Sequence, residues 1–270
     1  MIGETISRYK ILEKIGEGGR STVYRAEDVR LQRTVALKIM SEKWLTRPKA
    51  RLRFLREAQV VAQLEHPNIC TVYEVDVAEG YTFMAMSFVD GHSLSQKIER
   101  GPLYIKEAVN IGLQIARGLD AAHKRKIIHR DIKDGNIMIN REGIVKIVDF
   151  GLSKPLTKED ITKPRTILGT VPFMSPEQAT GEPVGYGTDI WSLGVVMYRM
   201  LTGMHPFKGR NVGEMINSIL KDEPARITKV RKAVPERLEY CIYRMMAKDS
   251  EDRHESMTEV ISDLRQVTSL

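Results

Sequence analysis

The segment IIHRDIKDGNIMIN, residues 127–140, concentrates polar side chains between two short apolar runs. Ile127 and Ile128 precede the polar residues, residues 137–139 follow them, and both runs are typical of short buried strands. Because buried charge is costly unless it is paired or used, a loop fixed at both ends is expected to employ these groups. The polar residues between the runs are His129, Arg130, Asp131, Lys133, Asp134 and Asn136.

The chemistry that these groups favour is phosphoryl transfer. Asp131 and Asn136 lie five positions apart, and Asp149 follows an apolar run that ends in VDFG at 148–151. Asn136 and Asp149 offer oxygen ligands of the hard type that Mg²⁺ prefers. Phosphoryl transfer needs positioning, metal ions on the phosphate oxygens and a carboxylate near the attacking hydroxyl, and this segment offers all three.

A glycine-rich turn, IGEGGRSTV at residues 15–23, lies between two predicted strands. Gly16 and Gly18 would let backbone amides approach a phosphate closely. A glycine hairpin without any ligand is the alternative reading. Ser21 stands where a G-x-G-x-x-G pattern would have its third glycine.

Lys38, in VALKIM at 35–40, alternates with apolar residues and shares a strand face with Ala36 and Met40. An ammonium group on such a face needs an anionic partner. Glu57 lies on the apolar stripe of a predicted helix at 50–65, so the two side chains are expected to pair. A purely structural salt bridge is the alternative.

Length and composition describe an ordinary globular protein. Of 270 residues, 42% are hydrophobic and 29% are charged, and nothing approaches the roughly 18 consecutive apolar residues of a membrane span. Cys70 and Cys241 match no metal or redox spacing, which favours reduced thiols in a cytosol. The net charge of +7 is scattered among acidic residues, so a solvated basic face is favoured over nucleic-acid binding.

The pattern of elements divides the chain into a strand-rich first third and a helical remainder, with a natural hinge near residues 87–91. The segment 188–203 is apolar nearly all round, which predicts a buried central helix that ends at Gly203. The long polar segment 149–177 is typical of a functional or mobile loop. Strands are predicted at 9–16, 21–28, 34–40, near 70–76 and 81–88, and helices at 50–65, 105–125, 188–202, 211–221 and 234–247.

In order, the chain carries GEGGRS, VALK, a helix glutamate, HPNI, HRDIKDGN, DFG, GT, SPE and DIWSLG. This ordered set resembles the protein kinase superfamily over essentially the whole length, and is similar to the bacterial serine/threonine kinases. The resemblance implies an α+β, two-lobed protein-kinase fold over residues 1–270. Its small antiparallel β-sheet N-lobe with one helix would span about 1–86, its hinge about 87–91, and its larger, mainly helical C-lobe about 92–270.

The resemblance also implies an activity, the transfer of the ATP γ-phosphoryl group to serine and threonine hydroxyls of proteins by a non-specific serine/threonine protein kinase. Asp131 would orient or deprotonate the substrate hydroxyl, and Lys133 would stabilise the γ-phosphate charge. Lys38 would contact the α- and β-phosphates while paired with Glu57. Asn136 and Asp149 would hold Mg²⁺, with Mn²⁺ as an alternative ion.

The same resemblance implies a nucleotide pocket and a structural frame. Met86 would be the gatekeeper residue before the hinge, Glu177 would pair with Arg253, and Asp189 would brace the catalytic loop. The residues implied to contact ATP are Ile15, Gly16, Gly18, Val23, Ala36, Lys38, Met86, Phe88, Val89 and Met138.

Regulation is implied by Arg130, which in this family usually awaits a phosphate on the activation loop. Thr166 is the first candidate for autophosphorylation and Thr162 the second, with a homodimer as the arrangement for that reaction. The alternative is that Thr166 is simply a solvated loop residue. Thr170 would contact the catalytic loop through Asp131 and Lys133.

Two departures from the family pattern matter. Ser21 replaces a glycine of the nucleotide lid, and Asp134 stands where proline is usual, which is expected to add negative charge near the metal site. The competing functions are a pseudokinase, which binds nucleotide or partners without turnover, and a small-molecule phosphotransferase. Expected partners are ATP and protein substrates, with no nucleic acid and no membrane segment in this chain. The expected location is the cytoplasm, including as the cytosolic catalytic domain of a longer protein.

Overall fold

The computed structural model describes residues 1–18, 21–41, 54–55, 58–150 and 169–268. Its internal contacts divide the chain into two compact units, Met1–Asp90 and Gly91–Leu270. A mainly antiparallel sheet unit is therefore followed by a mainly helical one, as the predicted α+β fold class requires.

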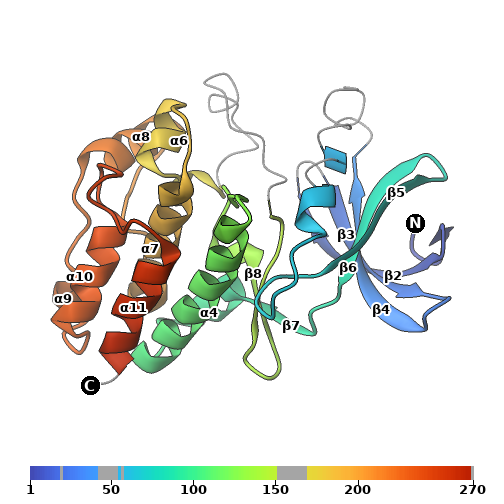
Figure 1. Cartoon of the computed structure of the whole chain (residues 1–270), viewed down its shortest axis with the longest axis horizontal. Helices are drawn as coiled ribbons and strands as arrows, with labels where there is room; N and C mark the ends of the chain where they lie inside the picture. The colour runs from blue at the N-terminus through green and yellow to red at the C-terminus, as the bar shows by residue number, and fades with distance from the viewer. Residues whose placement is uncertain (19–20, 42–53, 56–57, 151–168, 269–270) are drawn as a thin grey trace. The chain divides into compact units, whose positions relative to one another are not determined.

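The first unit is built on a six-stranded antiparallel sheet, which Figure 1 shows in blue and teal. The strands follow the order β1-β2-β3-β4-β6-β5. Each strand therefore pairs with the next strand in sequence, except that β4 pairs with β6 and β5 forms the edge of the sheet beside β6. The strands are β1 Thr5–Ile6, β2 Tyr9–Glu17, β3 Ser21–Asp28, β4 Arg33–Met40, β5 Val72–Ala78 and β6 Tyr81–Ser87.

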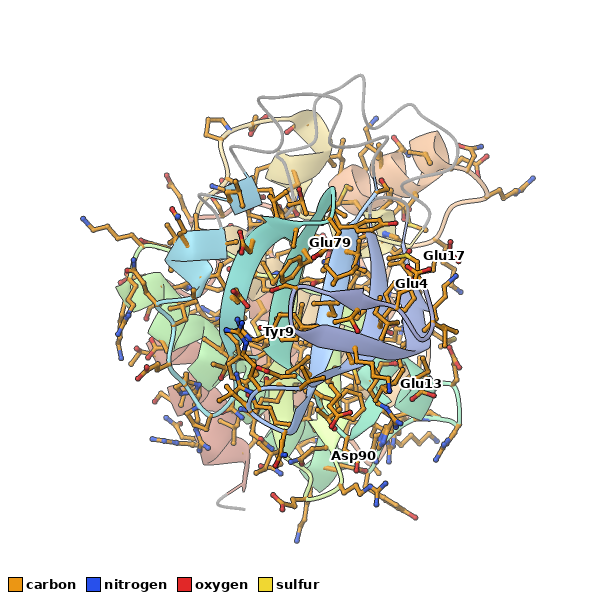
Figure 2. The ribbon with its side chains drawn as sticks, turned by 90° about the vertical axis from the view of Figure 1, so that its right-hand side faces the viewer. Glu4, Tyr9, Glu13, Glu17, Glu79 and Asp90 are labelled. Carbon is orange, nitrogen blue, oxygen red and sulfur yellow. The ribbon has the colours of Figure 1, made fainter. Side chains whose placement is uncertain are left out.

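Alternation of side chains along the strands separates two faces of this sheet. One face builds the core of the unit, where Tyr9 and Phe83 meet edge to face with ring centroids 5.6 Å apart. In Figure 2, Tyr9 lies among the strands, whereas the exposed acidic side chains Glu13 and Glu17 lie at the periphery of the sheet. The buried members of this core are Ile6, Tyr9, Ile11, Tyr24, Ala26, Val35, Leu37, Ile39, Phe83 and Ala85.

The predicted strands of this unit are confirmed to within about two residues at each end. Of the helix predicted at 50–65, the described residues 54–55 and 58–61 are helical, and a turn follows at residues 62–63. The apolar stripe of this helix is buried as predicted, at Phe54, Ala58, Val61 and Leu64.

The second unit begins with a small antiparallel sheet in the order β7-β8-β9, formed by Gly91–Ser93, Ile137–Asn140 and Val145–Ile147. This sheet brackets the polar segment at 129–136, because β8 starts directly after it. The helices of the second unit are α3 Leu94–Ile98, α4 Ile105–Lys124, α6 Pro176–Thr180, α7 Tyr186–Thr202, α8 Val212–Lys221, α9 Ile227–Val230, α10 Glu236–Met245 and α11 Met257–Thr268. Short 3₁₀ turns lie at Asp134–Asn136 and Val171–Phe173.

Helix α7 is the buried centre of the helical unit, as its apolar sequence predicts. It contacts α4 and α10, and α11 packs along α4, an arrangement that Figure 1 shows within this unit. The helix ends at Gly203, whose φ of 74° is the left-handed conformation that glycine adopts without steric cost.

The structure differs from the sequence-based prediction in several short elements. Ile127 and Ile128 do not form a strand, since the small sheet contains only β7, β8 and β9. Helices α3, α6, α9 and α11 were not predicted. Cys70 and Cys241 are both buried and neither forms a disulfide. No helix among the described residues has the length and apolar character to cross a membrane.

Candidate active site

The predicted catalytic loop, residues 127–136, is held in place by the carboxylate of Asp189 at the start of α7. Its oxygens accept the backbone N–H groups of His129 and Arg130, each at 2.9 Å, and one of them also lies 2.8 Å from His123 Nε2. Asp189 is fully buried, so these bonds compensate the cost of burying its charge. This is the bracing that the resemblance implies for Asp189.

His129 connects the loop to the end of β9. Its Nδ1 accepts the N–H of Asp131 at 3.2 Å, so Nε2 carries the proton and donates to the carbonyl of Val148 at 2.9 Å. The N–H of Val148 donates to the carbonyl of Asn136 at 3.0 Å. The backbone of Val148 thus ties His129 and Asn136 of the loop to the segment that leads into Asp149.

Asp131 lies at the centre of a polar network within the helical unit. Lys133 Nζ donates to its two carboxylate oxygens at 2.9 and 3.2 Å, and Asn136 Nδ2 donates to one of them at 3.0 Å. The same Lys133 Nζ donates to Thr170 Oγ1 at 2.9 Å. The structure therefore brings together Asp131, Lys133, Asn136 and Thr170, as the sequence predicts.

The two predicted metal ligands are positioned by the backbone, Asn136 through a hydrogen bond to a carbonyl and Asp149 through its own φ angle. Asn136 Nδ2 also donates to the carbonyl of Asp131 at 2.8 Å, which turns Oδ1, on the other side of the amide, away from that contact. Asp149 comes two residues after β9 and has a left-handed φ of 63°, a conformation that is uncommon for residues other than glycine. An amide oxygen and a carboxylate suit a hard divalent cation such as Mg²⁺.

Asp134 is buried and pairs with Arg199 of α7. The sequence predicts that this residue adds negative charge near the metal site. The structure changes that expectation, because a guanidinium from the central helix offsets the charge. The pair also anchors the 3₁₀ turn that carries Asn136.

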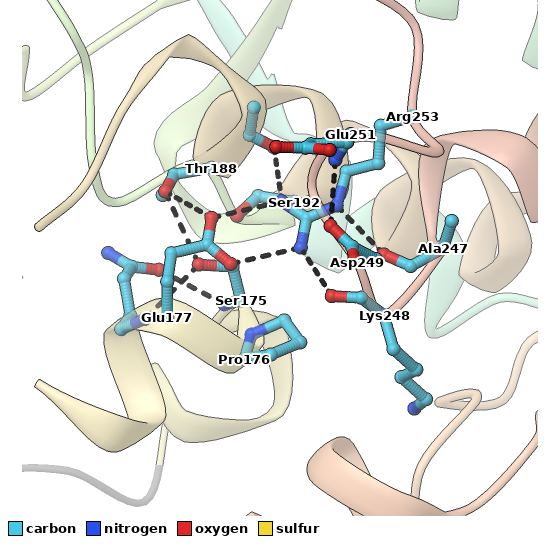
Figure 3. Close-up of polar contacts among 12 residues, drawn as sticks. Ser175, Pro176, Glu177, Thr188, Ser192, Ala247, Lys248, Asp249, Glu251 and Arg253 are labelled. Atoms are coloured by element: carbon cyan, nitrogen blue, oxygen red, sulfur yellow. Dashed lines mark hydrogen bonds and ion pairs between the residues drawn. The ribbon is translucent and has the colours of Figure 1, made fainter. Parts of the chain in front are cut away.

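A second ion pair joins α6 to the segment after α10. Glu177 accepts Arg253 Nη1 and Nη2, both at 2.9 Å, and also the hydroxyl of Thr188 at 2.7 Å, as Figure 3 shows. Burial alone would raise the pKa of Glu177, but the hydrogen bond and charge of Arg253 together with Thr188 outweigh it and lower this pKa below its ordinary value. The pairing predicted for these two residues is present.

In the first unit, four of the predicted nucleotide-contacting residues, Val23, Ala36, Lys38 and Met86, share one sheet face, opposite the apolar core. Val23 pairs with Lys38 across β3 and β4, and Ala36 pairs with Met86 across β4 and β6. Lys38 is only 7% exposed although it carries an ammonium group. Gly16 faces Val23 directly after a register shift in β2.

The remaining predicted residues are placed as follows. Gly18 donates its N–H to the carbonyl of Ser21 at 2.8 Å, and Ile15 is exposed. Phe88 and Val89 are half-buried after β6. Met138, in β8, is half-buried and pairs with Ser93. Glu57, Thr162 and Thr166 lie outside the described residues.

Sequence reasoning missed two residues that support the predicted catalytic loop. Gln178 Nε2 donates to the carbonyl of Arg130 at 2.8 Å, and its side-chain oxygen closes a capping box with Ser175. The S-P-E-Q sequence is a readable signal for that box. Arg199 was also missed, although a single arginine within a predicted buried helix marks a position that needs an anion.

Residues 9–264 match the profile of the protein kinase domain. The chain is 38% identical over 267 residues to the serine/threonine-protein kinase PrkC of Bacillus subtilis, covering 98% of this chain and 41% of that protein. It is 35% identical over 267 residues to PknB of Mycolicibacterium smegmatis, covering 96% of this chain and 43% of that protein. The chain thus spans about two fifths of the length of these curated relatives.

A solved structure gives the same fold. The kinase domain of PknI from Mycobacterium tuberculosis superposes with a TM-score of 0.80, covering 100% of this chain and 99% of that one, at 24% sequence identity. This similarity confirms the predicted two-lobed α+β fold class.

Proposed function

Because this chain belongs to the protein kinase family, we propose that it is an ATP-dependent serine/threonine protein kinase. The proposed reaction transfers the γ-phosphoryl group of ATP to serine and threonine hydroxyls of proteins, without narrow sequence specificity. The observation that carries the proposal is the network in which Lys133 bridges Asp131 and Thr170 while Asn136 holds the same carboxylate.

That network suits a residue that must accept a hydrogen bond from a substrate hydroxyl. An ionised carboxylate only accepts, and Lys133 and Asn136 fix the direction in which Asp131 presents its oxygens. Fixed geometry matters because phosphoryl transfer relies mainly on positioning and on electrostatic stabilisation. We therefore assign Asp131 the role of orienting or deprotonating the hydroxyl, and Lys133 the role of stabilising charge on the phosphoryl group.

We propose that Asn136 and Asp149 hold Mg²⁺, or alternatively Mn²⁺. A bound divalent ion would neutralise charge on the phosphate oxygens. Lys38, a buried ammonium on an otherwise apolar face, is proposed to contact the α- and β-phosphates with Glu57 as its partner. The adenine contacts are proposed for Val23, Ala36, Met86, Phe88, Val89 and Met138, with Ile15, Gly16 and Gly18 near the phosphates and sugar.

Regulation by phosphorylation of Thr166 or Thr162 is also proposed. The supporting observation is Arg130, whose φ is 67° and whose buried Nε has no hydrogen-bond partner within the described ranges. A phosphate group could supply that partner. If two copies phosphorylate each other, the initial rate of autophosphorylation will rise with the square of the protein concentration, whereas a reaction within one copy would give a first-order dependence.

The proposed organisation is an N-lobe of about 1–86, a hinge of about 87–91 and a C-lobe of about 92–270. The division between compact units after Asp90 falls inside the proposed hinge. We propose a cytoplasmic location for this catalytic domain, protein substrates as its partners, and no nucleic-acid ligand.

The test is a transfer assay with Mg·ATP and a generic protein substrate, run beside a separate measurement of ATP binding. Wild type is expected to transfer phosphate, and Lys38→Met and Asp149→Asn to lose transfer. Asp252→Asn, an exposed acid, is the matched control that should retain it. A wild-type protein that binds ATP but transfers nothing would instead make this chain a pseudokinase.

A further inference from the structure

Outside the catalytic loop, three metal-ligating side chains converge in the helical unit. Cys241 comes from α10, Asp263 comes from α11, and His254 comes from the segment between these helices. One ligand atom from each residue, the thiol sulfur, a ring nitrogen and a carboxylate oxygen, lies within 4.8 Å of the other two. The three residues are 13 and 9 positions apart in sequence, a spacing that gave no metal motif.

The cluster is mostly buried. Cys241 and His254 are each 2% exposed, whereas the side chain of Asp263 is 30% exposed and leaves a route for an ion to enter. His254 Nε2 lies 3.1 Å from Asp263 Oδ2. Because a carboxylate only accepts, this contact places the proton on Nε2 and the lone pair on Nδ1.

The ring nitrogen that faces Asp263 is Nε2, so an ion shared with Asp263 would be bound at Nε2. In the protein without an ion, Nε2 carries the proton and donates it to the carboxylate. An ion would take the lone pair of Nε2, the ring proton would move to Nδ1, and the hydrogen bond would be replaced by bonds from both side chains to the same ion.

The surrounding charges leave room for a cation. Arg244 Nη1 lies 3.8 Å from Asp263 Oδ2, but it makes its closer contact, at 2.6 Å, with Glu259 Oε1. Arg244 is therefore mainly the partner of Glu259. A divalent ion would balance one thiolate and the Asp263 carboxylate, which makes the loaded cluster electrically neutral.

We propose that Cys241, His254 and Asp263 form a binding site for Zn²⁺ that ties α10 to α11. A set of one sulfur, one nitrogen and one oxygen ligand suits zinc, whereas Mg²⁺ takes oxygen ligands. A water molecule would complete the four ligands, and binding would release the thiol proton. The inference rests on the helical unit alone and is independent of the proposed kinase activity.

The experiment uses the whole chain after treatment with a chelator and dialysis, with Co²⁺ as a spectroscopic substitute for Zn²⁺. Titration is expected to give one equivalent of bound cobalt with a thiolate-to-cobalt charge-transfer band, which Zn²⁺ abolishes and excess Mg²⁺ leaves in place. Cys241→Ser should lose the band, and His254→Asn should weaken cobalt binding by at least about tenfold. Cys70→Ser, which removes the other buried thiol, is the matched control and should keep the band.

A second measurement does not depend on the variants. Saturating Zn²⁺ should raise the Tm of the wild-type protein by a few degrees, and chelator should reverse the rise, because a ligand that binds only the folded state stabilises it. The absence of a cobalt band in wild type overturns the proposal. A band that persists in Cys241→Ser, or that disappears in Cys70→Ser, overturns it as well.

Discussion

Asp131 and Glu177 are carboxylates of the same helical unit, each paired with a cation and each with a side chain 13% exposed. Their cations differ. Lys133 is 23% exposed and divides one ammonium between Asp131 and Thr170. Arg253 is fully buried, and all five of its N–H groups are engaged, with Glu177 and with the carbonyls of Gly187, Ala247 and Lys248.

This difference separates an ion pair for which we propose a catalytic role from one that supports the fold. The guanidinium of Arg253 has no donor left for a ligand, so the pair with Glu177 can only hold the fold together. The ammonium of Lys133 is partly exposed and makes contacts that a substrate or phosphate could replace. The degree to which the cation is satisfied, rather than the burial of the carboxylate, distinguishes the two.

The largest effect is expected for Asp131→Asn. Because the amide cannot accept a proton, the rate of phosphate transfer should fall by about 10²–10⁴-fold, which is typical for the loss of a general base. The free energy of unfolding should change little. Transfer assays and urea titration check both, and a large loss of stability would mean that this pair is structural as well.

Glu177→Ala should instead reduce mainly the stability of the protein. It leaves Arg253 as a buried charge without its partner, which costs about 3–5 kcal/mol of folding free energy. Urea unfolding measures this loss, with Glu182→Ala, an exposed acid nearby, as the matched control. A loss below about 1 kcal/mol would remove the distinction drawn between the two pairs.

Acid should weaken the same structural pair. The pKa of Glu177 is lowered in the folded protein, so its contribution to stability is present above the ordinary glutamate pKa and is lost as the pH falls through the lowered value. Unfolding titrations between about pH 6 and 3 should therefore show a shallower loss of stability in Glu177→Gln than in wild type. Parallel curves for the two proteins would contradict the assignment.

The Asp134–Arg199 pair lies between these two cases, because it is buried but adjoins the turn that carries Asn136. Asp134→Asn should cost about 1–3 kcal/mol, since Arg199 keeps a polar neighbour but loses its counter-charge. A double-mutant cycle with Arg199→Met measures the coupling, and its absence would mean that the two residues act independently. Any accompanying change in the concentration of Mg²⁺ needed for activity would report on Asn136.

The smallest effect is expected at the N-terminus of α6. Ser175 caps this helix by accepting the N–H of Gln178, so Ser175→Ala should cost about 1 kcal/mol. Phosphate transfer should stay near the wild-type rate, because the bond from Gln178 to Arg130 does not need the serine hydroxyl. A large loss of activity would show that the N-terminal cap of α6 also supports catalysis.

The sequence predicts those parts of the fold in which a long repeat of apolar residues is present. Strands β2 to β6 of the first unit and helices α4, α7, α8 and α10 belong to this class, whereas the two-residue strand β1 was not predicted. Helices α3, α6 and α9 have four or five residues, too few for a helical period, and Ile127 and Ile128 form no strand because β8 pairs only with β7 and β9. Helix α11 is the exception, because it was not predicted although it carries an apolar repeat at Met257, Val260, Ile261, Leu264 and Val267.

Residues of the candidate site were predicted where they belong to a recognisable sequence motif. They were missed where their role depends on a partner that is distant in sequence. Asp131, Lys133, Asn136 and Thr170 could be placed together from their motifs. The partner of Asp134 could not, because Arg199 lies 65 positions away and only the packing of α7 brings it there. The convergence of Cys241, His254 and Asp263 depends in the same way on how α10 and α11 pack.

Val148 has a consequence for how substitutions in this region should be interpreted. Its carbonyl and its N–H join His129 and Asn136, and both belong to the main chain. Nineteen of the twenty amino acids would preserve that double attachment, and only proline, which lacks the N–H, would break it. A mutational scan could therefore score position 148 as tolerant although the peptide group there fastens the residue that follows, Asp149, to the loop.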